Sequence, residues 1–490
     1  MGKLYNPRLG NRLTNAAISA PMDLMLRSQR RDPNRLLPAQ SGARDIARAL
    51  YERVATRPII SPHGHVPAQL LAANSSFGNP AKLFVTDDHY ITRILHSAGV
   101  PLEVLGVGTS AEADPRTVWQ ELARHWYRFA GTASGYWLEE ALDTVFGIQD
   151  ELTVETADDI YDTLVEHLAH PDNRPLTLLD RFGIEFLATT DDPLDDLSHH
   201  RHLAKTHPST RVAPTFRPDR YLDSTLTTFA VDVHRLLAAT GQPATFAGYL
   251  HALQERREYF VAHGAVSTDH GVEEPYTVDL DAAEAEHIFA SLLRGTSTDA
   301  QRRAFSGHML LQMARMSVDD GLVMTIHAGV LRNHNTATTK RFGPDTGHDI
   351  PVPTTFTRGL RPLLERYGLE PGLHVVLFAV DETTYSRELA PLAGFYPSVY
   401  VGAPWWFLDA PDAIARFRSA VTETAGFYRT SGFIDDTRAF LSIPARHDTA
   451  RRADAGFLAR LVTEGRITLA AAERIADDLV STIPKEVFKL

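Results

Sequence analysis

A repeated pattern of short apolar runs that end in polar residues constrains the fold of this chain more than any other feature. Each run has the length of a buried strand, and segments of helical length separate the runs. Continuous apolar runs that alternate with helices are typical of parallel strands covered on both faces. The clearest runs are residues 57–65, 185–193, 211–219, 322–335, 373–382, 398–407 and 431–440, with 100–108 as a weaker eighth.

About eight strand–helix units predict an α/β fold of the TIM type, a closed (β/α)₈ barrel. The 490 residues exceed the roughly 250 of a minimal barrel, so we expect helical insertions near residues 110–180 and 225–300. Residues 1–40 are polar, rich in arginine and interrupted by proline, which predicts an N-terminal arm. Since no repeat or linker divides the remainder, we expect one domain over residues 41–490.

Two histidines in the first run predict a metal site. His63 and His65 stand two positions apart, so on an extended strand their side chains point to the same side. Asp435 and Asp436 end the last run, and closure of a barrel makes the first and last strands neighbours. Two histidines and one aspartate would bind a metal ion through nitrogen and oxygen and leave positions open. The pair could also be chance among 22 histidines, but its place at a strand end favours the metal.

Other histidines are open to more than one interpretation. His327 ends a central run, where it could be a further ligand, a proton-transfer group or a hydrogen-bonded pocket residue. Residues 198–207 contain His199, His200 and His202, but no apolar strand precedes them. We interpret that segment as a solvated helix face.

Three arginines fall at or just after strand ends: Arg217, Arg332 and Arg438. A guanidinium matches the two oxygens of a carboxylate, so several arginines around one pocket favour an anionic substrate. Each arginine by itself could instead pair with a nearby carboxylate such as Asp219 or Asp436.

Polar and aromatic residues beside these arginines suit a sugar. His89 and Tyr90 can exchange hydrogen bonds with hydroxyl groups or relay a proton. An indole of Trp405 or Trp406 could cover a sugar face or donate its N–H. Core packing is the alternative for one of the pair, because neighbouring strand residues face opposite ways.

Composition and missing motifs exclude several classes of protein. A net charge of −12 argues against a nucleic-acid surface or an anionic membrane as partner. Because cysteine is absent, any metal must be bound by His, Asp, Glu or water. No P-loop, dinucleotide fingerprint or serine elbow appears. Without an apolar leader or membrane-length run, a cytoplasmic protein is expected.

The ordered motifs resemble those of the uronate isomerase (glucuronate isomerase) family of the amidohydrolase superfamily. The resemblance extends from about residue 45 to about residue 455. Its motifs are HGH, DDHYITR, TTDDP, FRPD, HAGVLRNHN, PWWF and DDTRAFLSIPARHD, in that order.

The resemblance implies a distorted (β/α)₈ barrel that interconverts D-glucuronate with D-fructuronate and D-galacturonate with D-tagaturonate. It implies one divalent ion, zinc first and manganese or another ion as alternatives, and we also expect a homo-oligomer. The absence of a strand-end lysine argues for a mononuclear site. The metal ligands would be His63, His65 and Asp436; the catalytic residues Asp436, Tyr90, Arg438 and His327; the substrate-binding residues Arg217, His89, Arg332, Trp405 and Trp406.

Such an isomerisation moves a proton from C2 to C1 through an enediol. Our hypothesis is that Asp436, with Tyr90, moves protons, and that Arg438 and the metal stabilise the enediolate. Arg217 would bind the C6 carboxylate. One alternative is a metal-dependent hydrolase, an amidase or lactonase, on the same barrel. Another is a sugar-acid binding protein without activity, and a hydride-shift isomerase would normally need two metal ions.

Overall fold

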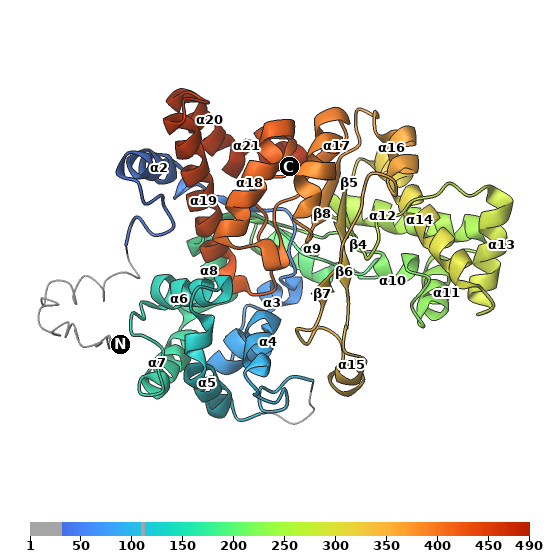
Figure 1. Ribbon diagram of the computed structural model, residues 1–490. Coiled ribbons are helices and arrows are strands. Elements are labelled where there is room, and N and C mark those ends of the chain that lie inside the picture. The colour runs from blue at the N-terminus through green and yellow to red at the C-terminus, as the bar shows by residue number, and fades with distance from the viewer. Residues whose placement is uncertain (1–31, 109–112) are drawn as a thin grey trace, which may run out of the picture.

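The computed structural model of the chain describes residues 32–108 and 113–490. Parallel strands run through its centre, and helices surround them (Figure 1). The central strands are β1 (Ile59–Ser61), β2 (Ile184–Ala188), β3 (Arg211–Ala213), β4 (Ser267–Val272), β5 (Val323–Ala328), β8 (Val375–Ala379) and β9 (Val399–Val401). A separate antiparallel hairpin consists of β6 (Val330–Leu331) and β7 (Ile350–Pro351).

The strands follow one another around a distorted (β/α)₈ barrel. One parallel sheet has the order β1-β2-β3 and the other β4-β5-β8-β9. Single bridges extend this order, from Phe216 after β3 to Thr268 of β4, and from Val401 of β9 to Thr430. The backbone N–H of His65 donates to the carbonyl of Thr437 at 3.0 Å, so the first and last segments are neighbours. The parallel barrel and its closure are therefore as predicted.

Burial explains why the strands read as continuous apolar runs. Every residue of β5 and of β8 is buried, because helices cover one side and the barrel interior the other. Val376 and Phe378 of β8 pack in one cluster, whereas Val375 and Leu377 pack in another. Each fully buried side chain of this size stabilises the fold by about 1.5–3 kcal/mol.

Helices form the outer layer, and local signals set their ends. The longest, α14, begins with a capping box of Thr298 and Gln301 and ends at Gly321, which has φ +80°. The helices are α2 (Ser41–Val54), α3 (Ala68–Ala73), α4 (His89–Ser97), α5 (Pro115–Arg124), α6 (Ala133–Phe146), α7 (Ala157–Ala169), α8 (Pro175–Arg181), α9 (Ser198–Thr206), α10 (Asp219–Leu222), α11 (Phe229–Thr240), α12 (Phe246–Ala262), α13 (Ala282–Leu293), α14 (Asp299–Asp320), α15 (Thr336–Phe342), α16 (Arg361–Tyr367), α17 (Ala390–Phe395), α18 (Pro411–Ala425), α19 (Ile443–Thr463), α20 (Leu469–Val480) and α21 (Thr482–Phe488).

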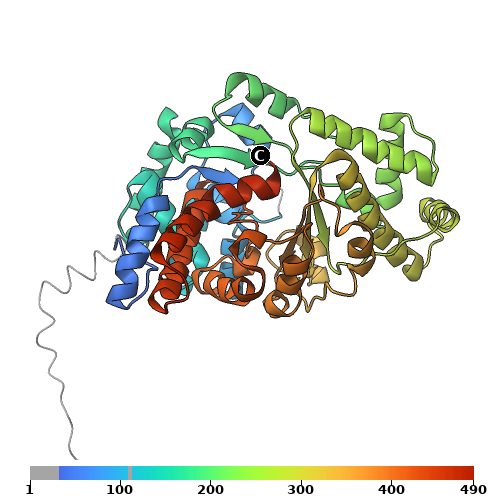
Figure 2. The same cartoon turned by 90° about the horizontal axis from the view of Figure 1, so that it is seen from above.

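Two groups of helices stand out from the barrel. Helices α5, α6 and α7 lie together on one side, and α11 to α14 gather at the opposite end (Figure 1). The early helix α2 packs against α19 and α20 of the C-terminal region, as the view from above also shows (Figure 2). Among residues 32–108 and 113–490, no helix is both long and apolar enough to cross a membrane.

The structure corrects the list of predicted strands at three places. Residues 100–108 form turns rather than a weak eighth strand, because Gly106 and Gly108 have positive φ and break an extended run. Residues 431–440 occupy the eighth position but form no regular strand, since Gly432 (φ +74°) and Asp436 (φ +40°) interrupt the ladder. Isolated contacts join them to their neighbours: the Ser431 N–H donates to the carbonyl of Val401, and the carbonyl of Thr437 accepts from His65. Strand β4 was missed, and it lies inside the region 225–300 where we expected a helical insertion.

Part of the predicted arm can be described, although residues 1–31 lie outside the described residues. Arg35 forms ion pairs with Glu140 of α6 at 2.6 Å and with Asp448 of α19 at 3.1 Å. Contacts to two separate helices attach residues 32–40 to the body of the molecule. The division into a 1–40 arm and one following domain remains a prediction.

Candidate active site

A cavity of about 360 Å³ opens at the carboxyl ends of the strands. All the candidate residues named from the sequence line it, although they come from segments far apart in the chain: His63, His65, His89, Tyr90, Arg217, His327, Arg332, Trp405, Trp406, Asp436 and Arg438. Such convergence is what barrel closure predicts, because the carboxyl ends of all strands share one face.

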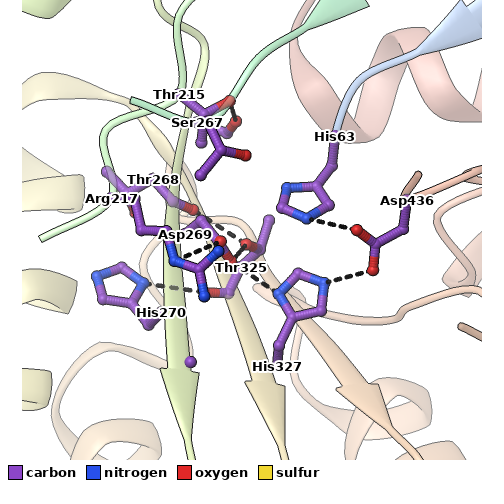
Figure 3. A network of polar contacts seen from close by, with 12 residues as sticks. His63, Thr215, Arg217, Ser267, Thr268, Asp269, His270, Thr325, His327 and Asp436 are labelled. Carbon is purple, nitrogen blue, oxygen red and sulfur yellow. Dashed lines mark hydrogen bonds and ion pairs between the residues drawn. The ribbon is translucent and has the colours of Figure 1, made fainter. Parts of the chain in front are cut away.

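Three histidines surround the carboxylate of Asp436 at the bottom of this cavity. Nε2 of His65 lies 2.9 Å and Nε2 of His63 lies 3.3 Å from Oδ1 of Asp436. Nε2 of His327 lies 3.9 Å from the other oxygen, Oδ2. His63 and His327 both point toward Asp436 (Figure 3), and their rings stack with centroids 4.5 Å apart.

The backbone at Asp436 explains which of the two neighbouring aspartates enters the site. Asp436 has φ +40°, a conformation that is rare for residues with a side chain and concentrates at functional sites. Asp435 points elsewhere, and its Oδ2 lies 3.0 Å from Nε2 of buried His447. The turn therefore separates the two carboxylates, and Asp436 alone reaches the histidines.

Asp269 is one of the site residues that sequence reasoning missed. It lies on β4, where its Oδ1 is 2.7 Å from Nδ1 of His327 and accepts a hydrogen bond from Thr325 Oγ1 at 3.1 Å. Its Oδ2 lies 3.4 Å from Nε of Arg217. The run AVSTDHGV contains small and polar residues rather than large apolar ones, which hid the strand. The sequence did contain a signal for a strand end here, because Asp269, His270 and Gly271 follow the β-branched residues Val266 and Thr268.

Charges in the cluster shift its ionisation. Burial by itself would raise the pKa of Asp436, but the neighbouring imidazoles of His63 and His65 outweigh it and hold that pKa well below its usual value. Asp269 behaves in the same way, because Arg217 and His327 outweigh burial and keep its pKa well below normal. Burial lowers the pKa of His65, which favours its neutral form. His63 differs, because the charges of Asp269 and Asp436 outweigh its burial and raise its pKa. The two ionised carboxylates therefore favour a positive charge at this place, which is where a metal cation would bind.

The donor set fits a divalent metal ion. Ligand atoms of His63, His327 and Asp436 all lie within 4.8 Å of one another. Nε2 of His327, which faces Asp436, is buried without a hydrogen-bond partner among the described residues, which is costly for a polar group unless something binds it. The predicted ligands His63 and Asp436 are thus joined by His327, whereas His65 contacts the same carboxylate from the side.

The three arginines reach the cavity from different elements. Arg217 contacts two carboxylates through its Nε atom, which lies 2.8 Å from Asp219 Oδ2 and 3.4 Å from Asp269 Oδ2. The other two pair with carboxylates of residues 329–352, the excursion that includes the β6–β7 hairpin and α15. Arg332 Nη1 lies 3.0 Å from Asp349 Oδ2, and Arg438 Nη2 lies 3.0 Å from Asp345 Oδ2.

Aromatic residues form one wall of the cavity. The rings of His89 and Tyr90 stack at 4.7 Å, and burial raises the pKa of Tyr90 well above its usual value, so the phenol stays protonated. Both Trp405 and Trp406 line the cavity, and both are also buried in the hydrophobic cluster that contains Phe378, so the two indoles do not divide into one facing the cavity and one in the core. The strand-alternation rule fails here because β9 ends at Val401 and Trp406 has φ +55°. Arg446 also lines the cavity and was not predicted.

The histidine-rich segment 198–207 is the helix α9, but its predicted solvation is wrong for one residue. His199 and His202 are exposed, whereas His200 is buried and its Nε2 lies 2.7 Å from Thr189 Oγ1. A histidine at the inward position of an amphipathic helix packs against the barrel, and periodicity alone did not reveal this.

Comparison with known proteins agrees with this fold. A family model described as glucuronate isomerase matches residues 41–488. A uronate isomerase from Corynebacterium efficiens is 51% identical over 461 residues, which cover 94% of this chain and 98% of that protein. The crystal structure of glucuronate isomerase from Caulobacter crescentus superposes with TM-score 0.91 at 45% identity, covering 93% of this chain and 96% of the other. The uronate isomerase structure from Thermotoga maritima gives TM-score 0.88 at 28% identity, with coverages of 93% and 99%. The chain belongs to the glucuronate isomerase family.

Proposed function

We propose that this protein is a uronate isomerase that interconverts D-glucuronate with D-fructuronate and D-galacturonate with D-tagaturonate. The observation that carries the proposal is the arrangement of one cavity, in which a carboxylate surrounded by three histidines faces arginines and aromatic residues. An acid–base centre beside several cations is what an anionic sugar needs in order to move a proton between C2 and C1. The family membership supports the same reaction.

We propose that His63, His327 and Asp436, with His65 beside them, bind one divalent metal ion, with zinc as the first candidate. When bound, the ion supplies Lewis-acid stabilisation of negative charge on a substrate oxygen. Nitrogen and oxygen donors of this kind also suit manganese and other divalent ions. His327 is prepared for this role, because Asp269 engages its Nδ1 and leaves Nε2 available.

Asp436 is the proposed base for the proton on C2. Its Oδ1 is held by His63 and His65, whereas the closest ion-pair partner of Oδ2 is His327 Nε2 at 3.9 Å. Oδ2 is therefore the oxygen with freedom to accept a proton from C2 and to return it to C1. The protonated phenol of Tyr90 can exchange a proton with the substrate oxygens as the carbonyl moves from C1 to C2.

The arginines complete the proposed mechanism. Arg438 lines the same cavity as Asp436 and stabilises the enediolate by donating hydrogen bonds to the developing oxyanion. Arg217 binds the C6 carboxylate, and its Nε contacts with Asp219 and Asp269 keep the guanidinium in place. Arg332, His89, Trp405 and Trp406 surround the sugar hydroxyls and exclude water from the enediol.

Proton NMR in D₂O tests the proposal. Purified protein, stripped of metal and then reloaded with Zn²⁺ or Mn²⁺, is incubated separately with D-glucuronate and with D-galacturonate. Ketose signals with deuterium at C1 are expected, because a carboxylate exchanges its proton with solvent. Ketose without deuterium would indicate a shielded proton or a hydride shift. If neither uronate changes under any metal condition, the isomerase proposal is wrong, and lactones and amides become the substrates to assay.

A further inference from the structure

One peptide group of the HGH segment is held at both ends by residues from different parts of the barrel. The carbonyl of Gly64 accepts a hydrogen bond from Oγ1 of Thr190 at 2.8 Å. The N–H of His65, which belongs to the same peptide group, donates to the carbonyl of Thr437 at 3.0 Å. This peptide joins Gly64 to His65 and so lies between the two histidines, and its orientation sets the direction of the backbone from which both imidazoles project.

The hydrogen bond from the Thr190 side chain connects the segments that follow β1 and β2, beyond the point where the backbone pairing of these strands ends. The pairing of β1 with β2 stops at Ser61 and Leu187, so the backbone beyond it has no ladder bonds between these two strands. On its other side the segment of Thr190 is anchored to the segment that follows β3. Asp191 N–H donates to the carbonyl of Thr215 at 3.0 Å, and Arg217 N–H donates to the carbonyl of Asp191 at 3.1 Å.

We propose that Thr190 is a positioning residue that fixes the Gly64–His65 peptide and thereby both histidines. Thr190 is absent from the lining of the catalytic cavity, so it acts through the histidines and not on the substrate. A peptide group held at its carbonyl and at its N–H cannot rotate. If the hydroxyl is removed, one end is released, and His63 and His65 lose their common orientation toward Asp436.

The Gly64–His65 peptide also contacts the segment that carries Asp436. Thr437, the acceptor on the far side of the peptide, follows Asp436 directly in the chain. The hydrogen bonds from Thr190 through this peptide to Thr437 therefore join the histidines to the carboxylate that they surround. Because the inference concerns metal ligands and turnover, it rests on the proposed function.

Three variants separate positioning from general stability. Thr190→Val removes the hydroxyl and keeps the shape of the side chain, whereas Thr190→Ser keeps the hydroxyl. Thr210→Val is the matched control, because Thr210 Oγ1 also donates to a backbone carbonyl, that of Ile184, at 2.8 Å. That bond lies at the opposite end of β2, away from the cavity.

The readout is affinity for Co²⁺, measured from its visible absorption in competition with a chelator, together with kcat, KM and the thermal unfolding midpoint. Thr190→Val is expected to bind Co²⁺ about 10- to 100-fold more weakly, as for other residues that orient metal ligands. Its kcat should fall by a larger factor than the factor by which its KM changes. Thr190→Ser should restore both properties. Thr210→Val should lose stability and retain metal affinity.

Other outcomes would overturn the inference. If Thr190→Val and Thr210→Val bind Co²⁺ as tightly as the wild type, Thr190 contributes only to stability. If the wild type isomerises a uronate but binds no Co²⁺, the metal positioning is wrong and the isomerase remains. If the wild type neither binds metal nor isomerises either sugar, the proposed function itself fails.

Discussion

Nδ1 of His327 lies 2.7 Å from Oδ1 of Asp269, and the two residues stand on neighbouring parallel strands, β5 and β4. Since the carboxylate is ionised, it accepts the Nδ1 proton, which leaves the lone pair of the imidazole on Nε2. That nitrogen is the one that faces Asp436. The pair therefore fixes the ring tautomer that a metal ligand needs.

Replacing Asp269 should weaken the hydrogen bond that fixes the tautomer of His327. Asp269→Asn keeps the size of the side chain and removes its charge, so the Nδ1 proton is held less strongly. We expect metal affinity or turnover to fall about 10- to 100-fold, the usual effect of changing the partner of a ligating histidine. Chelator competition and steady-state kinetics measure this. Unchanged values for both would show that Asp269 does not tune His327.

Asp436 and its neighbour Asp435 provide a matched pair of variants. Asp436→Asn should lower kcat about 10²- to 10⁴-fold if its carboxylate is the base that moves the proton. Asp435→Asn should keep most of its activity and lose stability, because Asp435 contacts buried His447 and does not line the cavity. Metal content must be measured in both proteins. Equal losses of kcat at equal metal content would contradict the assignment of the base.

Arg217 should determine how tightly the uronate binds. Arg217→Lys keeps a positive charge beside Asp219 and Asp269 but loses the forked geometry. A hydrogen bond to a charged group contributes about 1.5–3 kcal/mol, so we expect KM for D-glucuronate to rise about 10- to 150-fold with a smaller change in kcat. The same measurement on Arg332→Lys is the comparison. If KM rises for that variant and not for Arg217→Lys, Arg332 binds the carboxylate.

Asp191 should make stability depend on pH. Burial raises its pKa from an ordinary 3.8 to about 7, so the folded state holds a proton that the unfolded chain releases at lower pH. Its contribution to stability is present below pH 4 and is lost as the pH rises through 7, at no more than about 1.4 kcal/mol per pH unit. Asp191→Asn mimics the protonated form and should remove this slope.

Urea unfolding of the wild type and Asp191→Asn at several pH values between 4 and 8 measures the difference. The free energy of unfolding of the variant, relative to that of the wild type, should increase steadily between pH 4 and 7. Asp409, which is also buried and has a pKa raised to about 7, is unchanged in both proteins and cancels in the comparison. Parallel pH profiles for the two proteins would show that Asp191 does not titrate in this range.

The amino-acid sequence by itself determined most of the strand pattern and most of the charged and aromatic residues that line the cavity. Buried parallel strands need continuous apolar runs, and their polar ends must meet at one face of a barrel. For that reason His63, His327 and Asp436 could be named in advance, as could the three arginines. The ordered motifs also predicted the family, because several short matches in one order are more specific than any one of them.

Only the tertiary structure decided how these residues act on one another. Asp269 lies on a strand of small and polar residues, and its contact with His327 depends on the register of two strands far apart in sequence. The left-handed turn at Asp436 and the hydrogen bond from Thr190 to Gly64 likewise depend on long-range packing. The pattern of apolar residues indicates which residues are buried and which lie at strand ends. The distances between their side chains are set only when the barrel closes and brings the strands together.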